Sequence, residues 1–409
     1  MIRSVTVVVG GALLVLATGG PAVAERSVAD LLGRTPTPEG QPKTLLEELT
    51  LFGYIENSYV WNLGRSRGDI NELRFYDVDR EYTFNAFELS LKKDASERYP
   101  LGFGVVVTAG DDSKKNHALG MFRDADDRPP YYRETIPFDL PEAYVTYRVP
   151  IGNGLTVKAG KWATPIGYEV YESPKNLNFS RSFLYTLGTP YTHTGLTVTY
   201  PFTSWFSATA GVTNGWDNAD NNNGHLRPIG TFALTPTDTL SFTTSYLFGV
   251  EQNRNQLGGR GGHWRWIVDN TLLYTGIDKL TLAINFDIAG EDNEPNLVAT
   301  GRRNRTAHWG GVAGYAAYGW TKALRTALRL EYFSDADGPR NAIRPAGQKL
   351  DLYEVTATLE YRIWRGLVGR VEYRHDRASE KAFGVGRADL APTANTQNTI
   401  AFAFYYAFF

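Results

Sequence analysis

The chain has 409 residues, a formal net charge of −2, 21% charged and 13% aromatic residues, and no cysteine. The lack of cysteine excludes a disulfide framework, a thiolate metal site and a C-x-x-C-H haem attachment. The nearly balanced charge lacks the excess of basic residues that is typical of nucleic-acid-binding proteins. No apolar stretch of 18 residues follows the first 24 residues, which excludes a membrane protein built from helices.

The first 24 residues have the pattern of a secretory signal peptide. A short charged head precedes an apolar run from Val5 to Ala17, and Ala22-Val23-Ala24 forms a small-residue cleavage site before Glu25. A membrane anchor is the alternative hypothesis, but the apolar run is short for that role. Residues 25–49 are polar and rich in proline, which is typical of a flexible periplasmic leader.

Alternating apolar and polar residues recur in sixteen segments of residues 50–409. Between Leu280 and Ile288 every second residue is apolar, the pattern of a strand with one face toward lipid and the other toward water. The expected strands are 50–61, 84–94, 101–110, 139–149, 154–163, 191–201, 204–215, 228–235, 239–250, 263–275, 279–290, 307–320, 323–333, 351–363, 367–377 and 395–409.

The connections between these strands alternate between long and short. A soluble β-sandwich would also show alternating faces, but short turns such as Pro236-Thr237-Asp238 and Gly276-Ile277-Asp278 fall at every second junction. Short periplasmic turns, long external loops and an even strand count are typical of outer-membrane barrels. We therefore expect an all-β fold, a transmembrane antiparallel barrel of about sixteen strands.

The last strand is strongly aromatic. Ile400, Phe402, Phe404, Tyr406 and Phe408 alternate with smaller residues, one position out of phase with the terminal Phe409. A terminal phenylalanine is typical of barrels that the outer-membrane assembly machinery inserts, so this machinery is an expected partner. The face taken by Phe409 stays open.

Three local patterns resemble the β-barrel porin-2 family of OmpL-like porins. They are Gly-Tyr-Ile-Glu-Asn-Ser-Tyr at residues 53–59, the stretch 158–182 with Lys-Trp-Ala-Thr-Pro-Ile-Gly-Tyr-Glu at 161–169, and Pro-Tyr-Thr-His-Thr-Gly at 190–195. The resemblance covers residues from about 50 to the end of the chain. It implies a general or substrate-selective outer-membrane pore in outer-membrane lipid and does not name a solute.

Residues 164–190 are too long for a turn, and loops of this length in a compact fold are usually functional. The third external loop of classical sixteen-stranded porins folds inward and narrows the pore, so the resemblance predicts an inward-folded loop here. The alternative is a rim loop that only covers the mouth. The candidate constriction residues are Glu169, Asn176, Asn178, Ser180, Arg181 and Ser182.

The late strands place several charges on the face expected to line the lumen. Such charges select ions by forming an electrostatic barrier or well. Cross-strand ion pairs that only stiffen the wall are the alternative, and both can hold together. The arginines favour a preference for anions. The residues are Arg325, Arg329, Arg362, Arg370 and Arg374, with Glu331, Glu354, Glu360 and Glu372 among them.

No pattern predicts a metal, a cofactor or a catalytic centre. Residues 217–224 lack the glycine and glutamate spacing of a calcium loop, and the six histidines have no metal-ligand spacing. His193 with Ser182 and Asn178 suggests a barrel lipase only weakly, because a triad is defined by geometry.

The sequence thus predicts a passive diffusion channel for small hydrophilic solutes or ions, with no enzymatic activity. A barrel that encloses a periplasmic partner such as a multihaem cytochrome is the alternative, and a barrel lipase is a third hypothesis. A homotrimer is expected only by analogy with other porins.

Overall fold

The computed structural model describes residues 25–408, except 39–40, 42, 65–70, 72, 75, 77–80, 123–135, 253–262, 294–297, 299–304, 342–346 and 385–391. The expected signal peptide and Phe409 lie outside the described residues. Within them, no helix combines the length and the apolar character that a membrane crossing needs.

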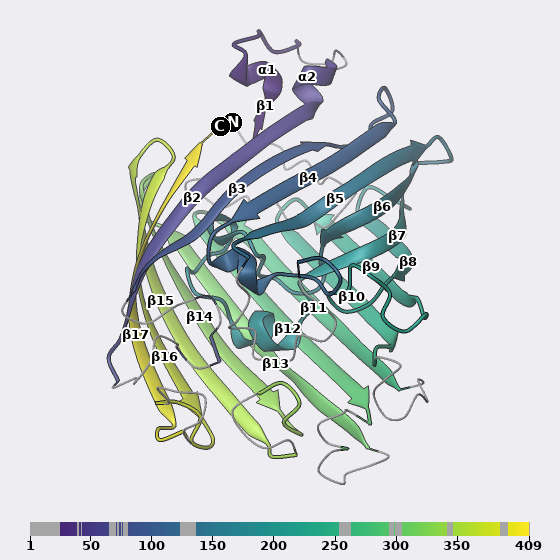
Figure 1. The fold of residues 1–409 in the computed structure, drawn as a ribbon. Helices are drawn as coiled ribbons and strands as arrows, with labels where there is room; N and C mark the ends of the chain where they lie inside the picture. The colour runs from purple at the N-terminus through teal and green to yellow at the C-terminus, as the bar shows by residue number, and fades with distance from the viewer. Residues whose placement is uncertain are drawn as a thin grey trace.

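Sixteen antiparallel strands form a closed barrel (Figure 1). Each strand pairs with its neighbour in the chain, and the last strand closes the barrel on the first with a register from Thr399 opposite Asn62 to Phe408 opposite Gly53. The strands are β2 (Leu49–Asn62), β3 (Tyr82–Lys93), β4 (Leu101–Ala109), β5 (Phe138–Val149), β6 (Leu155–Ala163), β7 (Thr192–Pro201), β8 (Phe206–Thr213), β9 (Arg227–Thr237), β10 (Leu240–Val250), β11 (Trp264–Ile277), β12 (Leu280–Asp292), β13 (Thr306–Gly319), β14 (Leu324–Asp335), β15 (Leu350–Trp364), β16 (Leu367–Ala378) and β17 (Thr396–Phe408). The predicted fold class is confirmed.

The two faces of each strand differ as the alternation predicts. In β12 the side chains of Ile284, Phe286 and Ile288 are exposed on the outside, whereas Asn285 and Asp287 are buried inside the barrel. The apolar residues therefore form the belt that meets lipid, and the interior is polar.

The segment before the barrel contains short structured elements. β1 (Arg26–Ser27) pairs with Leu51 and Thr50 of β2, just beyond the point where β17 ends. Two one-turn helices follow, α1 (Val28–Leu31) and α2 (Leu45–Glu48). Hydrogen bonds from Thr37 and Thr44 hold the pKa of Glu47, in α2, at about 2. Two residues are too few for β1 to give a periodic sequence pattern.

Short and long connections alternate along the barrel. The connections 238–239, 278–279 and 365–366 lie at the end that carries α1, α2 and the C-terminus, at the top of Figure 1. The connections 110–137 and 164–191 belong to the other end. By the usual orientation of such barrels, the first end faces the periplasm.

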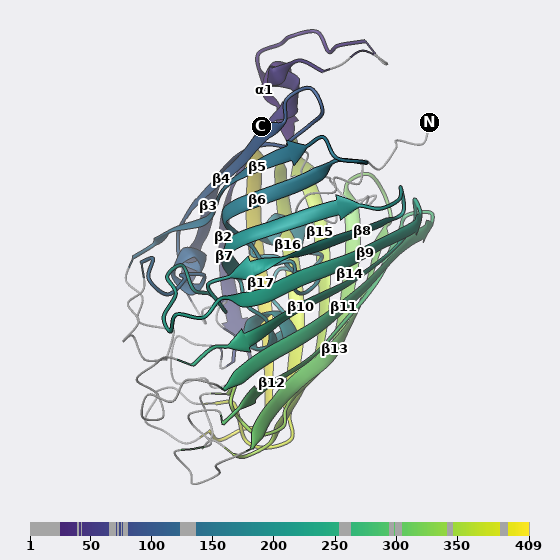
Figure 2. The ribbon, with the colours of Figure 1, turned by 90° about the vertical axis from the view of Figure 1, so that its right-hand side faces the viewer.

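The wall is not equally high all round. β8 has 8 residues and β15 has 15, and Figure 2 shows β4–β8 from the outside as the shorter part of the wall. Two pieces of external loop lie inside the barrel, the one-turn helices Asp112–Lys115, against β3–β5, and Leu184–Gly188. The second is the short teal helix beside β12 and β13 in Figure 1.

Candidate functional site

The connection between β6 and β7, residues 164–191, folds into the barrel, and we call it the inward loop. Every side chain from Asn176 to Pro190 is buried. Gly167 has φ +102°, a backbone conformation that other residues adopt only with strain. It lies near the point where the chain turns inward. The fold predicted for this loop is confirmed, and it is not a rim loop.

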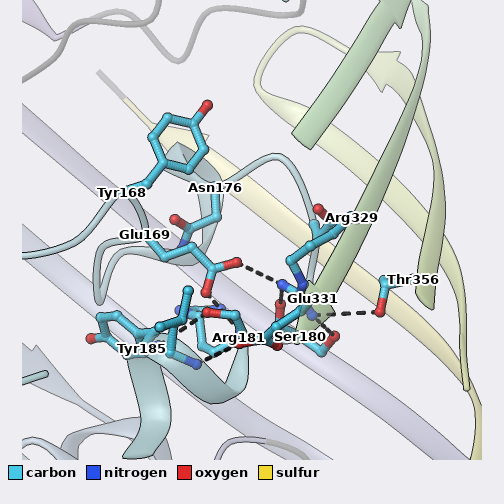
Figure 3. Close-up of polar contacts among 12 residues, drawn as sticks. Tyr168, Glu169, Asn176, Ser180, Arg181, Tyr185, Arg329, Glu331 and Thr356 are labelled. Atoms are coloured by element: carbon cyan, nitrogen blue, oxygen red, sulfur yellow. Dashed lines mark hydrogen bonds and ion pairs between the residues drawn. The ribbon is translucent and has the colours of Figure 1, made fainter. Parts of the chain in front are cut away.

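Arg329 of β14 is the centre of the contact between the inward loop and the wall (Figure 3). Its guanidinium is fully buried and forms ion pairs with Glu169 of the loop at 2.6 Å and with Glu354 of β15 at 2.7 Å. The same group donates hydrogen bonds to the carbonyl oxygen of Ser180 at 2.6 Å and to the Thr356 hydroxyl at 3.4 Å. A planar guanidinium suits such a site because its donors fan out in fixed directions.

Two wall carboxylates hold the backbone of the inward loop. Glu331 accepts hydrogen bonds from the backbone amides of Phe183 and Leu184 at 2.8 and 2.6 Å. Glu372 accepts from Phe179 and Ser180 at 2.7 and 3.0 Å. Glu331 lies at the start of the turn Leu184–Gly188, where free amides favour a negative charge.

Arg370 and Arg374 of β16 complete the attachment. Arg370 pairs with Glu360 at 2.7 Å and donates to the carbonyl oxygens of Ser173 and Asn176, each at 3.0 Å. Arg374 pairs with Asp376 at 2.7 Å and donates to the carbonyl oxygen of Arg181 at 2.5 Å. These contacts fix the loop backbone from Ser173 onward.

The remaining predicted residues separate into two groups. Asn178 donates to Thr358 of β15 at 2.7 Å and so belongs to the attachment, whereas Arg325 forms a cross-strand ion pair with Glu360 at 2.8 Å within the wall. Ser182 accepts from Tyr185 and donates its backbone amide to Glu169. Arg362 is half-buried near the periplasmic end of β15 and does not join the cluster in the described part of the chain.

The inward loop therefore lies directly on the arginine-rich wall, not across an open gap from it. Arg329, Arg370 and Arg374 are at most 1% exposed. The sequence places these arginines correctly on the inner face, but the expectation that they face solute in the open lumen is not what the geometry shows. They are covered because the loop residues supply the oxygen acceptors that buried guanidinium groups need.

The inward loop also contacts β2 and β5, through residues that the sequence pattern did not single out. Tyr171 donates to Glu142 of β5 at 3.1 Å, and Ser173 donates to Glu56 of β2 at 2.6 Å. Glu56 shares its face with Tyr54 and Ser58 by simple alternation, so its inward position was predictable. Its partner in the loop was not.

Two further external segments, the β2–β3 and β4–β5 connections, lie close to Arg181 of the inward loop. The Arg181 guanidinium lies 5.1 Å from the ring centre of Tyr76, within cation–π range. Burial raises the pKa of the nearby Asp112 carboxyl from 3.8 to about 7, although Lys115 and Arg181 favour its charged form. In the described residues, no group of three or more acidic or histidine side chains is placed to hold a metal ion.

The comparison with known families fits this geometry. The model of the family described as "Putative beta-barrel porin-2, OmpL-like" matches residues 48–408. The chain belongs to this porin family. It is therefore an outer-membrane porin, as the resemblance in its first strand and inward loop predicts. No curated protein sequence matches the chain.

Solved structures show the same fold at low sequence identity. The outer-membrane channel DcaP of Acinetobacter baumannii is 12% identical, with a TM-score of 0.59 over 88% of this chain and 97% of that chain. The anion-selective porin from Comamonas acidovorans is 12% identical, with a TM-score of 0.55 over 88% and 99%. The trimer form of OmpT of Vibrio cholerae is 12% identical, with a TM-score of 0.52 over 88% and 99%.

Proposed function

We propose that this porin is a passive diffusion pore whose open path runs between the inward loop and the wall formed by β6–β10. The observation that carries this proposal is the attachment of the loop to β14–β16 by ion pairs and backbone hydrogen bonds. The loop narrows the barrel, and on the other side Ser207 and Thr209 of β8 are only half-buried. A narrowed polar lumen of this kind passes small hydrophilic solutes.

The arginine cluster gives little support to a strong anion preference. Each of Arg329, Arg370 and Arg374 has a carboxylate partner within 2.7 Å, and a paired, buried charge projects a weak field into the lumen. Lys158 of β6 forms no ion pair in the described structure and lies 4.3 Å from the Tyr144 ring centre. We propose at most weak anion selectivity, carried by Lys158. The anion selectivity of the Comamonas acidovorans porin is a property of that protein.

Single-channel recording tests the pore directly. Purified porin in a planar bilayer should give stable conductance steps, and reversal potentials in asymmetric KCl should lie close to zero. The absence of any conductance would overturn the proposal. A haem absorption band in the purified protein would support the rival hypothesis of a barrel around a cytochrome, although the inward loop occupies the space that such a partner would need.

The lipase hypothesis loses its geometric basis. One ring nitrogen of His193 lies 2.9 Å from the Thr164 hydroxyl and the other 3.3 Å from the Gly215 carbonyl oxygen. The Ser182 hydroxyl accepts from the backbone amide of Tyr185. A serine nucleophile needs a hydrogen bond to its base, and these contacts direct both groups elsewhere.

We propose that the low wall is the contact surface between copies in a homotrimer. An eight-residue strand tilted by about 40° spans roughly 20 Å, less than the apolar band of about 25 Å that such barrels present to lipid. Several outward residues of the low wall are also small, namely Val107, Ala143, Ala159, Ala208 and Ala210, although Leu101, Tyr147 and Leu196 are larger. Small side chains allow two walls to approach closely, and a neighbouring copy would cover the short strands.

A further inference from the structure

The lumen is divided into a charged and an uncharged side. β7, β8 and β10 contain no Asp, Glu, Lys or Arg, and all their residues are described. The only charged residue of β9 is Arg227, at the external end of the strand, where it pairs with Glu251 of the β10–β11 connection at 3.1 Å. The charges of the interior therefore lie mainly on the strands outside this group.

Hydroxyl groups take the place of charges on the inner face of these strands. The register puts Thr199 opposite Thr209, Thr209 opposite Thr231 and Thr231 opposite Ser245, so one row crosses four strands. The outward neighbours in the same strands, such as Leu196 and Phe232, are exposed and apolar. We call Thr197, Thr199, Ser207, Thr209, Thr231 and Ser245 the hydroxyl face.

The hydroxyls in the row bond to one another. The oxygens of Thr199 and Thr209 are 2.8 Å apart, and those of Thr231 and Ser245 are 3.0 Å apart, with either atom able to donate. A hydroxyl carries one donor and two acceptor positions and rotates freely. Each pair can therefore open toward a passing solute and close again behind it.

The inward loop contacts this face at Ser245. Among the described residues, one hydrogen bond joins the loop to it, from Ser245 to the carbonyl oxygen of Pro165 at 2.9 Å. Ser207 and Thr209 of β8 are half-buried, whereas the other four residues of the face are buried. A solute that passes the loop on this side therefore meets the hydroxyls of Ser207 and Thr209 first.

We propose that the hydroxyl face guides neutral, polyhydroxylated solutes of monosaccharide size through the pore. This inference rests on the proposed pore function and names its solute class. Rotatable protein hydroxyls can form the hydrogen bonds that water molecules otherwise make with the hydroxyl groups of the solute. An ion on the same path loses hydration and finds no opposite charge on this face, so it gains less from the contact.

Liposome swelling with solutes of matched size tests the solute class. Glucose should enter faster than gluconate and faster than protonated glucosamine. The variant Thr199→Val/Thr209→Val keeps the side-chain shape and removes one hydroxyl pair. Its glucose rate should fall by roughly three- to tenfold, the range that loss of one net hydrogen bond implies, while its KCl conductance stays near that of the wild type.

Thr244→Val is the matched control. Thr244 lies in β10 on the outer face and donates to Asn270 at 2.9 Å. The same change there should leave the glucose rate unaltered. Thr209→Glu provides a second test with a different readout, since a carboxylate on the hydroxyl face should shift the reversal potential toward cations and slow glucose.

The outcomes separate the two proposals. If no solute causes swelling and no conductance is recorded, the proposed pore function is overturned. If the protein conducts but glucose, gluconate and glucosamine enter at equal rates, and the double valine variant takes up glucose at the wild-type rate, only the proposed solute class is overturned.

Discussion

Arg329 joins the inward loop, β14 and β15 through one guanidinium group. Replacing it by Met would leave Glu169 and Glu354 buried without their cation, and loss of one partner of such a pair typically costs about 3–5 kcal/mol. We expect Arg329→Met to detach the loop from the wall. Single-channel traces should then show a larger and noisier conductance than those of the wild type.

Arg362→Met is the control for this variant. Arg362 is on the same inner face but is half-buried and outside the cluster. Its replacement should leave the conductance steady. If Arg329→Met also behaved like the wild type, the ion pairs would not hold the loop.

Asp112, in the β4–β5 connection, makes the packing of this connection beside Arg181 of the inward loop sensitive to pH. Because burial raises its pKa in the folded protein to about 7, the folded state holds a proton between about pH 4 and 7 that the unfolded state releases. Stability from this group is therefore full at low pH and falls as pH rises to about 7. The groups that face it are Lys115 and Arg181, which favour its charge, and Glu56 and Asp111, which oppose it.

Asp112→Asn should remove this dependence. The temperature of the heat-induced shift on SDS gels should fall from pH 5 to pH 8 in the wild type and change less in the variant. The free energy of unfolding that Asp112 contributes changes by at most about 4 kcal/mol with pH, because each unit of pKa difference between the folded and unfolded states is worth about 1.36 kcal/mol. A wild type that is more stable at pH 8 than the variant would contradict the assignment.

The inward loop, as an element, both narrows the barrel and covers the charged wall. Deletion of residues 174–182 should raise the conductance, because these residues are buried inside the lumen. It should also expose Arg370 and Arg374 to passing ions.

Combining the loop deletion with the substitution Arg370→Glu therefore gives a sharper test than either change alone. Arg370→Glu in the full-length chain should shift the reversal potential little, since Arg370 is 1% exposed and covered by the loop. In the deletion variant the same substitution should shift it clearly toward cations, and more so at low salt, because exposed charges are screened over about 8 Å at physiological ionic strength. Equal shifts in both backgrounds would mean that the arginines already face the open path.

At the scale of the whole molecule, the low wall is the surface that we propose as the contact between copies. On the low wall, Ala210→Trp adds a large side chain that lipid tolerates and a close-packed interface does not. We expect it to convert trimers to monomers on native gels. Gly314→Trp is the matched control on the high wall, where a side chain would meet open space. A wild type that is already monomeric would overturn the proposed trimer.

The topology of the whole barrel can be checked from outside the cell. The native chain has no thiol, so single cysteines report cleanly. A cysteine at Asn222, in the connection from β8 to β9, should label on intact cells. A cysteine at Asp238, in the turn from β9 to β10, should label only after the outer membrane is permeabilised.

The sequence by itself determined the barrel. A strand between lipid and water must alternate at every residue, so β12 can be recognised from Leu280 to Ile288 without any knowledge of its neighbours. The inner position of Arg329, Glu331 and Arg370 follows from the same rule. The inward fold of residues 164–190 was predictable from their length and from the family resemblance.

Only the tertiary structure decided what the inner residues contact. Glu169 and Arg329 are 160 positions apart, and the β6–β7 connection must enter the barrel before they can pair. Alternation fixes a face but carries no information about the partner across the lumen. From the sequence, the arginines could be lumen charges or partners in cross-strand ion pairs, and the structure shows ion pairs together with the attachment of the loop. The hydroxyl face likewise exists only because the register aligns single hydroxyls from four strands into one row.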